Sequence, residues 1–80
     1  CENIVQLEGI VITPFCIVTE FLGGGDLRSH LDKQIVIKVR DMQLVIRDIV
    51  NGMAHLAAHR LIHRDLAARN VLLTDQLRAK

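Results

Sequence analysis

The sequence predicts a small α+β fold in which a hairpin of strands is followed by two helices and a second, shorter hairpin. Three observations support this order. β-Branched residues are frequent on both sides of Thr13-Pro14, apolar residues recur at three- and four-residue steps through residues 39–59, and short apolar runs return in residues 71–79. The chain has 80 residues, enough for one small domain.

The first hairpin is predicted within residues 4–19. Ile4–Leu7 and Gly9–Ile12 are rich in β-branched residues, as strands are. Thr13-Pro14 supplies the turn, because proline presets its own φ and has no amide hydrogen for a central ladder. Phe15–Thr19 is predicted to return as the second strand and to be buried.

Three glycines, Gly23–Gly25, break the apolar pattern and form the best internal boundary. Their spacing does not match a phosphate-binding loop, so we interpret them as a flexible hinge. Asp26 follows at an N-cap position, where its carboxylate can accept hydrogen bonds from amides of the first turn. A short helix is therefore predicted from Asp26 to about Asp32, with Leu27 and Leu31 on one face.

A longer helix is predicted from Val39 to about His59, after a segment, residues 33–38, that fits a strand or a loop equally well. Gly52 lowers the helix propensity of this stretch and indicates a close packing contact. Val71–Leu73 and Leu77–Ala79 are predicted to form the second hairpin. One apolar stripe marks the buried face of the long helix: Met42, Val45, Ile46, Ile49, Met53, Leu56 and Ala57.

Composition excludes several classes of function. The formal net charge is +1 with charges of both signs interspersed, so nucleic-acid binding is not expected. No apolar run is long enough to span a membrane, and direct membrane contact is not expected from this segment. Cys1 and Cys16 lack disulfide or metal spacing and are expected to be reduced. The few aromatic residues and the opening at Cys1 suggest a piece of a larger protein.

Two histidines, His55 and His59, stand four residues apart on the long helix. A metal pair would need further ligands, and no third one converges in the sequence. We therefore interpret both as solvated or loop-packing residues.

The polar string His-Arg-Asp-Leu-Ala-Ala-Arg-Asn at residues 63–70 carries the chemistry. The carboxylate of Asp65 can orient a substrate hydroxyl and take its proton. Asn70 offers a neutral oxygen to Mg²⁺, which prefers oxygen ligands. Alone, Asp65 would be a solvated charge and Asn70 a turn residue, but the complete string between a helix and a short strand favours phosphoryl transfer.

This string resembles the catalytic loop of protein tyrosine kinases. Residues 18–22 resemble the strand and hinge between the two kinase lobes, residues 51–56 the helix that leads to the loop, and residues 70–73 the strand that follows. The resemblance implies part of a two-lobed protein kinase fold. Residues 1–22 would be the end of the N-lobe sheet and the hinge, and residues 23–80 the start of the C-lobe.

The resemblance also implies catalytic roles. Asp65 would be the catalytic base and Asn70 a ligand of Mg²⁺. Arg69, together with Ala67, is similar to the tyrosine-specific form of the loop, because serine/threonine kinases usually carry Lys at the position of Ala67. Arg64 would pair with a phosphotyrosine of the activation loop.

For ATP, the resemblance implies a further set of residues. Thr19 would be the gatekeeper of the adenine pocket, the backbone of Glu20 and Leu22 would hydrogen-bond adenine, and Leu72 would form an apolar floor. Asp26 would contact the ribose, although helix capping alone would also explain it.

Two further residues, His63 and Leu7, would belong to the apolar regulatory spine, with His63 packed beneath the loop. The glycine-rich loop, the phosphate-binding Lys and the Asp-Phe-Gly motif of the family are not in these 80 residues, so this piece alone is expected to be inactive. The predicted parent phosphorylates protein tyrosine in the cytoplasm, as a receptor or a cytoplasmic kinase. The alternative is a pseudokinase or a truncated kinase-like binding module.

Overall fold

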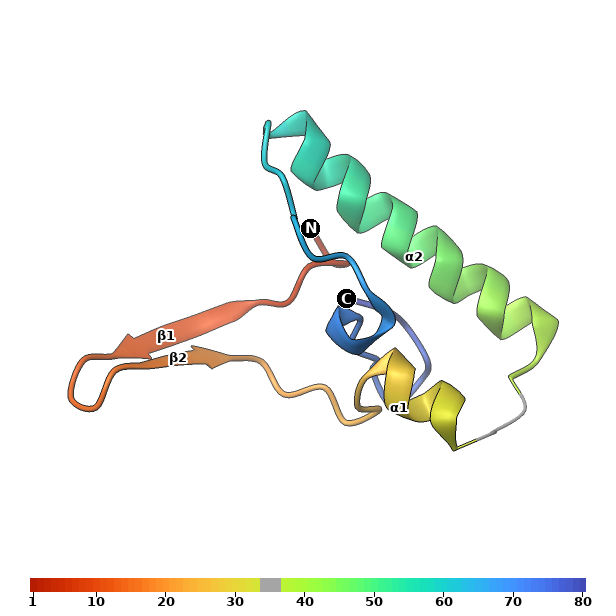
Figure 1. Ribbon diagram of the computed structural model, residues 1–80, viewed down its shortest axis with the longest axis horizontal. Helices are drawn as coiled ribbons and strands as arrows, with labels where there is room; N and C mark the ends of the chain where they lie inside the picture. Colours follow the sequence, from red (N-terminus) through yellow and green to blue (C-terminus); the bar gives the residue numbers. More distant parts are fainter. Residues whose placement is uncertain (34–36) are drawn as a thin grey trace.

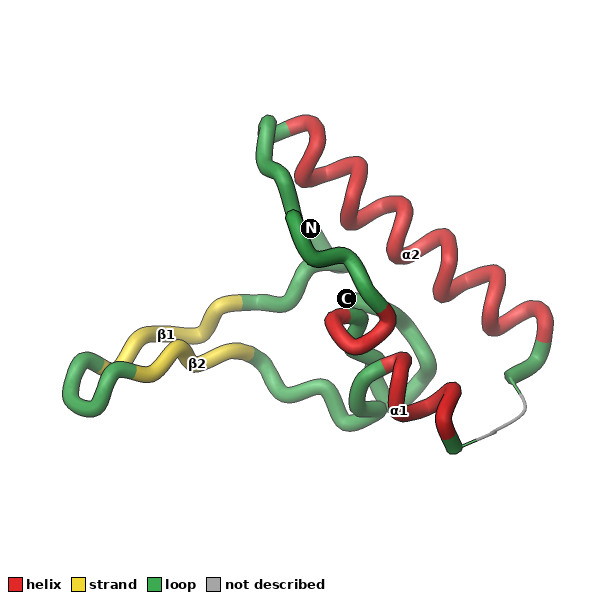
Figure 2. Tube along the Cα trace, viewed as in Figure 1, coloured by secondary structure: helices red, strands yellow, loops and turns green. Residues whose placement is uncertain are grey.

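The computed structural model describes residues 1–33 and 37–80, and residues 34–36 of the ambiguous segment lie outside the described part. Figure 1 shows a hairpin that projects away from a packed region made of two helices and the C-terminal segment. Figure 2 shows that much of this packed region is loop. The elements are β1 (Leu7–Val11), β2 (Cys16–Thr19), α1 (Leu27–Asp32), α2 (Val39–Ala58) and the 3-10 turn η1 (Ala68–Asn70).

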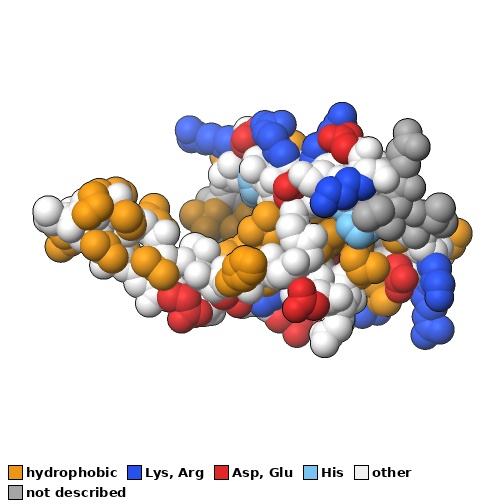
Figure 3. Space-filling view, turned by 90° about the horizontal axis from the view of Figure 1, so that it is seen from below, with side chains coloured by type: hydrophobic (Ala, Val, Ile, Leu, Met, Phe, Trp, Pro, Cys, Tyr) orange, Lys and Arg blue, Asp and Glu red, His pale blue; other side chains and the backbone are white. Residues whose placement is uncertain are grey.

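The predicted hairpin is confirmed but is shorter than expected. β1 pairs antiparallel with β2, with Leu7 opposite Thr19 and Val11 opposite Cys16. The prediction that the second strand is buried is wrong, because every residue of β2 is exposed and Ile17 keeps 63% of its surface. Among the described elements, no helix packs on the hairpin. Figure 3 shows its hydrophobic side chains gathered on the projecting end.

The short helix forms where the sequence predicts it. Asp26 is its N-cap in an extended conformation, and its carboxylate accepts hydrogen bonds from the Ser29 amide and hydroxyl, each at 2.8 Å. Leu27 is buried, whereas Leu31 is exposed. Capping and one apolar contact are therefore enough to define α1.

The long helix α2 ends one residue before its predicted limit, and Val45 and Gly52 lie on its buried face as expected. A Cβ on Gly52 would lie 2.7 Å from the carbonyl oxygen of Asn3, which confirms the predicted close contact. Ile46 was predicted to be buried but is 54% exposed. No described helix has the length and apolar character that crossing a membrane requires.

A buried carboxylate on α2, that of Asp48, is unexpected from the sequence. Its side chain is 2% exposed and forms a bidentate ion pair with Arg78. Arg78 Nη2 lies 2.7 Å from Asp48 Oδ1, and Arg78 Nε lies 2.8 Å from Asp48 Oδ2. It also accepts a hydrogen bond from the Ala79 amide at 3.0 Å. Asn3 donates to the Ala79 carbonyl from the other side at 2.9 Å. These bonds fix the C-terminal segment against α2 and the N-terminal segment.

The predicted second hairpin forms only an isolated bridge, and residues 71–73 pair on two sides. Leu73 is bridged to Ala79, and Leu72 exchanges two backbone hydrogen bonds of 2.9 Å with Lys80. On its other side, Leu72 is bridged to Asp26. The buried core lies around this strip and consists of Leu27, Val45, Val71, Leu73 and Ala79.

Candidate active site

The loop of residues 63–70 brings together the three side chains predicted to act in catalysis, Asp65, Arg69 and Asn70. Arg69 donates to one carboxylate oxygen of Asp65 at 2.6 Å, and the Asn70 amide donates to the other at 3.0 Å. The same Asn70 nitrogen donates to the backbone carbonyl of Asp65 at 2.8 Å. The acid and the amide therefore converge on one point, five residues apart in the sequence.

Local backbone geometry explains this convergence. Arg64 has a positive φ of 73°, which turns the chain just before Asp65. The Asp65 amide donates to the His63 ring nitrogen Nδ1 at 3.1 Å. The 3-10 turn η1, closed by the bond from Asn70 N to Ala67 O at 2.9 Å, then returns Asn70 to the aspartate. Sequence patterns did not predict this turn, because three residues are too few for any periodicity.

The electrostatics keep Asp65 ionised. The hydrogen bond from Asn70 is the main cause of a lowered pKa, followed by the hydrogen bond and charge of Arg69. Both members of the Asp65–Arg69 pair are more than 60% exposed, so this pair orients the carboxylate and adds little stability. At neutral pH, Asp65 is thus an oriented, charged hydrogen-bond acceptor in contact with solvent.

The Asn70 side chain has an oxygen suited to Mg²⁺. The amide nitrogen of Asn70 donates its hydrogen bonds to Asp65, so the carboxamide oxygen of Asn70 points away from this contact and can act as a hard neutral ligand. Among the described residues, no group of three or more His, Cys, Asp or Glu side chains is placed to hold a metal ion. The Asn70 side chain is therefore suited to bind Mg²⁺. A complete magnesium site would need further oxygens from phosphate, water or other segments.

The residues predicted for adenine lie at the end of β2 and in the segment that follows. The Thr19 side chain is exposed, and its hydroxyl donates to the Glu20 carbonyl at 3.2 Å. The Glu20 amide donates to Gln6 O at 2.9 Å, which ties the segment after β2 to the segment before β1. The Leu22 carbonyl accepts the Gly25 amide at 3.3 Å and closes a turn.

Two other predicted nucleotide residues, Asp26 and Leu72, are brought side by side by their bridge. Gly24 N donates to Leu73 O at 2.8 Å, and a Cβ on Gly24 would lie 2.6 Å from that same oxygen. The glycine run therefore allows close backbone approach here, which differs from the flexible hinge expected from the sequence.

An ion pair between Glu20 and Lys80, which the sequence did not indicate, joins the segment after β2 to the C-terminal segment. Lys80 Nζ lies 2.7 Å from a carboxylate oxygen of Glu20, and both side chains are partly buried. The hydrogen bond from Lys80 is the main cause of the lowered pKa of Glu20. No local pattern could have found this pair, since the two residues are far apart in the chain.

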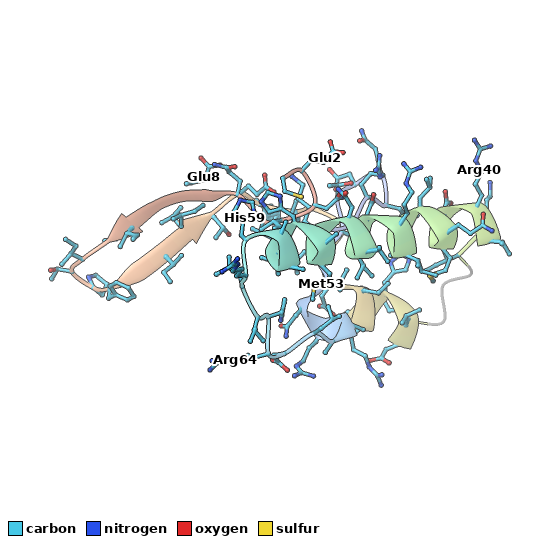
Figure 4. The ribbon with its side chains drawn as sticks, turned by 90° about the horizontal axis from the view of Figure 1, so that it is seen from above. Glu2, Glu8, Arg40, Met53, His59 and Arg64 are labelled. Atoms are coloured by element: carbon cyan, nitrogen blue, oxygen red, sulfur yellow. The ribbon has the colours of Figure 1, made fainter. Side chains whose placement is uncertain are left out.

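An apolar cavity with a volume of about 210 Å³ lies between the N-terminal segment, α2 and the loop of residues 63–70. His63 and Asn70 line it, and none of Thr19, Glu20 or Leu72 does. Figure 4 shows Met53, another lining residue, between α2 and the elements below it. The cavity thus opens beside the catalytic loop and not at the predicted adenine wall.

The packing predicted for the spine residues is not observed in the described structure. His63 is exposed at the rim of the cavity, and Leu7 is 52% exposed on β1. Each lacks a covering element among the described residues, so neither is packed as expected.

Comparison with known proteins gives a consistent result. The family model for protein tyrosine and serine/threonine kinases matches residues 1–80. The chain is 44% identical to the human ephrin type-B receptor 4, and 39% identical to the tyrosine-protein kinase receptor svh-2 of Caenorhabditis elegans. Each of these alignments covers 98% of the chain and 8% of the relative.

Relatives of both kinase classes match. The serine/threonine-protein kinase STY46 of Arabidopsis thaliana is 42% identical over 92% of the chain and 13% of its own length. The chain therefore spans a small part of each of these relatives. Together with the match of the family model along the whole chain, these similarities show that the chain is part of a protein kinase domain and belongs to the protein tyrosine and serine/threonine kinase family.

Proposed function

We propose that this chain carries the catalytic loop and part of the ATP site of a protein tyrosine kinase, which transfers the γ-phosphoryl group of ATP to a tyrosine hydroxyl. The observation that carries the proposal is the contact of both Arg69 and Asn70 with the two carboxylate oxygens of Asp65. In this proposal, residues 1–22 end the N-lobe sheet and form the hinge, and residues 23–80 begin the C-lobe.

Each of these side chains has a distinct role. Asp65 accepts the hydrogen bond of the substrate hydroxyl and takes its proton as the oxygen attacks phosphorus. Arg69 and Asn70 hold that carboxylate in one orientation, because each engages a different oxygen. Asn70 also presents its free oxygen as a ligand for Mg²⁺, which when bound neutralises phosphate charge.

The tyrosine preference rests on the side chains that flank Asp65. Ala67 stands where a serine/threonine kinase usually carries Lys, and Arg69 with Ala67 resembles the tyrosine-specific form of the loop. Arg64 is exposed, and Figure 4 shows it at the outer edge of the loop, accessible to a phosphotyrosine. The proposal implies action in the cytoplasm, at the inner side of the membrane if the protein is a receptor.

The nucleotide residues are proposed to surround adenine and ribose. The Glu20 carbonyl and the Leu22 amide would bond the base beside Thr19, above Leu72, and Asp26 would meet the ribose. The bridge between Asp26 and Leu72 supports this, since it holds the proposed ribose contact beside the proposed floor.

The test is Asp65→Asn in the protein at its natural length. Loss of the proton acceptor should reduce turnover of a tyrosine peptide by about 10²–10⁴-fold. ATP affinity should stay within about twofold, because Asp65 lies in the loop and outside the proposed adenine contacts.

Asp32→Asn is the matched control, because Asp32 is an exposed aspartate that forms an ion pair with Arg28 on the same helix, away from residues 63–70. It should leave turnover unchanged. Near-normal turnover in Asp65→Asn would remove Asp65 as the base, and preferred phosphorylation of a serine peptide by the wild type would overturn the tyrosine assignment.

A further inference from the structure

Backbone hydrogen bonds tie the glycine run to the short strip, residues 71–74, that carries the proposed floor of the adenine site. Three bonds of 2.8 Å form this ladder: Gly24 N to Leu73 O, Leu73 N to Gly25 O, and Leu27 N to Val71 O. Figure 1 shows the chain before α1 passing beside the C-terminal segment. The position of Gly24 on the strip therefore helps to set how far the segment after β2 lies from Leu72.

Gly24 lies closer to the strip than a residue with a side chain could. A Cβ added at Gly24 would lie 2.5 Å from Thr74 O, 2.6 Å from Leu73 O and 2.9 Å from Leu73 Cβ. These distances are well inside van der Waals contact, and the two oxygens belong to the backbone. A side chain at Gly24 would thus force one of the two backbone segments to move.

The strip is held in place from its other side. Leu72 exchanges two backbone hydrogen bonds of 2.9 Å with Lys80, and Thr74 N donates to Arg78 O at 2.8 Å. Leu73 is completely buried in the core. A side chain at Gly24 would therefore displace the segment around Gly24 and leave the strip where it is.

The segment that would move carries proposed nucleotide contacts on both sides of Gly24. In the proposed function, the amide of Leu22 bonds adenine and Asp26 meets the ribose, whereas Leu72 stays on the fixed strip. We propose that Gly24 is a positioning residue for ATP, because its lack of a side chain sets the spacing between the adenine and ribose contacts and the floor. This inference rests on the proposed function of those residues.

Gly23 provides a matched comparison within the same glycine run. The three atoms nearest to a Cβ added at Gly23 all belong to the carboxyl group of Asp75. Asp75 is exposed, so its carboxylate can rotate away without any movement of the backbone. Gly23→Ala thus makes the same chemical change one residue earlier and should leave the spacing intact.

The test compares the two alanine variants in the protein at its natural length. Gly24→Ala should raise the Kd and the KM for ATP at least about fivefold, the effect of about one lost hydrogen bond. Its kcat at saturating ATP should stay within about twofold, because Asp65 and Asn70 keep their contact. Gly23→Ala should change neither constant by more than about twofold.

The outcomes separate positioning from a merely structural role. A Gly24→Ala variant with a lower Tm and an unchanged KM for ATP would overturn the proposal, as would equal effects of the two alanine substitutions. Absence of ATP binding by the wild type would refute the proposed function itself. Wild-type ATP binding that Gly24→Ala leaves unchanged would refute this inference alone.

Amide hydrogen exchange of the wild type tests the same ladder if Gly24→Ala does not fold. Saturating ATP should slow exchange at the amides of Gly24 and Leu27 at least about threefold more than at Ala79. The Ala79 amide is the control, because it bonds to Asp48 on the other side of the strip. Equal slowing at all three amides would overturn the proposal, because ATP would then stabilise the domain as a whole and not this ladder.

Discussion

The β1–β2 hairpin and the C-terminal segment 71–80 have similar apolar sequences but opposite surroundings. In the hairpin, Ile10, Phe15 and Ile17 are exposed. In the C-terminal segment, Leu73 and Ala79 are completely buried. Hydrophobic composition therefore does not determine burial in this chain.

The two segments differ in the contacts that other parts of the chain make with them. The C-terminal segment is bonded to residues 24–27 on one side, and α2 covers it through the Asp48–Arg78 pair. Among the described residues, the hairpin has only its own two strands. Three matched pairs of substitutions can break or sharpen this comparison in the kinase domain that contains the chain. Each pair has one member in the hairpin and the other in the C-terminal segment or in α2, which packs against it.

One of the two largest effects on stability is expected at Asp48, the buried carboxylate on α2. Asp48→Ala leaves the Arg78 guanidinium and the Ala79 amide without their acceptor, and should cost about 2–4 kcal/mol of the free energy of unfolding. Glu8→Ala, on the exposed hairpin strand β1, should cost less than about 0.5 kcal/mol. Denaturant unfolding measures both, and equal losses would contradict the comparison.

The loss of stability at low pH should depend on the same carboxylate, that of Asp48. The hydrogen bond from Arg78 is the main cause of the lowered pKa of Asp48 in the folded state. A depressed folded pKa contributes stability that is present above the unfolded pKa, ~4, and is lost as pH falls through the folded pKa. Asp48→Ala should therefore flatten the loss of stability below ~pH 4 in denaturant unfolding measured across this pH range.

Aliphatic truncation tests the comparison directly. Leu73→Ala should cost about 2–5 kcal/mol, because it leaves a cavity in the core. Ile17→Ala should cost less than about 0.5 kcal/mol if the hairpin is as exposed in the whole domain as it is in this structure. A loss at Ile17 near that at Leu73 would show instead that another part of the domain covers the hairpin.

A smaller effect is expected from adding one methyl group. In Gly52→Ala, the new Cβ would lie 2.7 Å from Asn3 O, and the net cost should be about 1–2 kcal/mol after the gain in helix propensity. Gly9→Ala meets nothing within 4 Å on the hairpin and should be within about 0.5 kcal/mol of neutral. Thermal unfolding of both variants decides whether close packing explains Gly52.

Whether a feature could be predicted from the sequence depends on how far apart in the chain its interacting residues lie. The hairpin, the cap at Asp26 and the bounds of α2 were predictable, because each depends on neighbours a few residues away. The bridge between Asp26 and Leu72 joins distant segments and leaves no local pattern. The same holds for the buried charge of Asp48, which is compensated by Arg78 from another part of the chain.

The candidate site shows the same limit. The string at residues 63–70 identified Asp65, Arg69 and Asn70, and the structure brings them into contact. It could not indicate that the Asn70 nitrogen faces the carboxylate, nor that the apolar cavity lined by His63 and Asn70 lies away from Glu20. Those features depend on the turn at η1 and on the packing of the N-terminal segment against α2.

The smallest effect on stability is expected at Asp26, where two roles can be separated. Both carboxylate oxygens accept bonds from Ser29, and these bonds are the main cause of the lowered Asp26 pKa. Asp26→Ala should lower Tm by about 2–4 °C, because the N-cap is lost. Asp26→Ser should keep most of that stability, since serine is also a good N-cap.

The serine variant has a shorter side chain, so it retains the cap but cannot reach a ribose. If Asp26 also contacts the nucleotide, Asp26→Ser should weaken ATP binding severalfold at nearly unchanged Tm. The carboxylate retains acceptor capacity beyond its two bonds to Ser29, so both roles can coexist. ATP titration of the serine variant at wild-type affinity would assign Asp26 to helix capping alone, and would leave its neighbour Leu72 as the proposed nucleotide contact on this bridge.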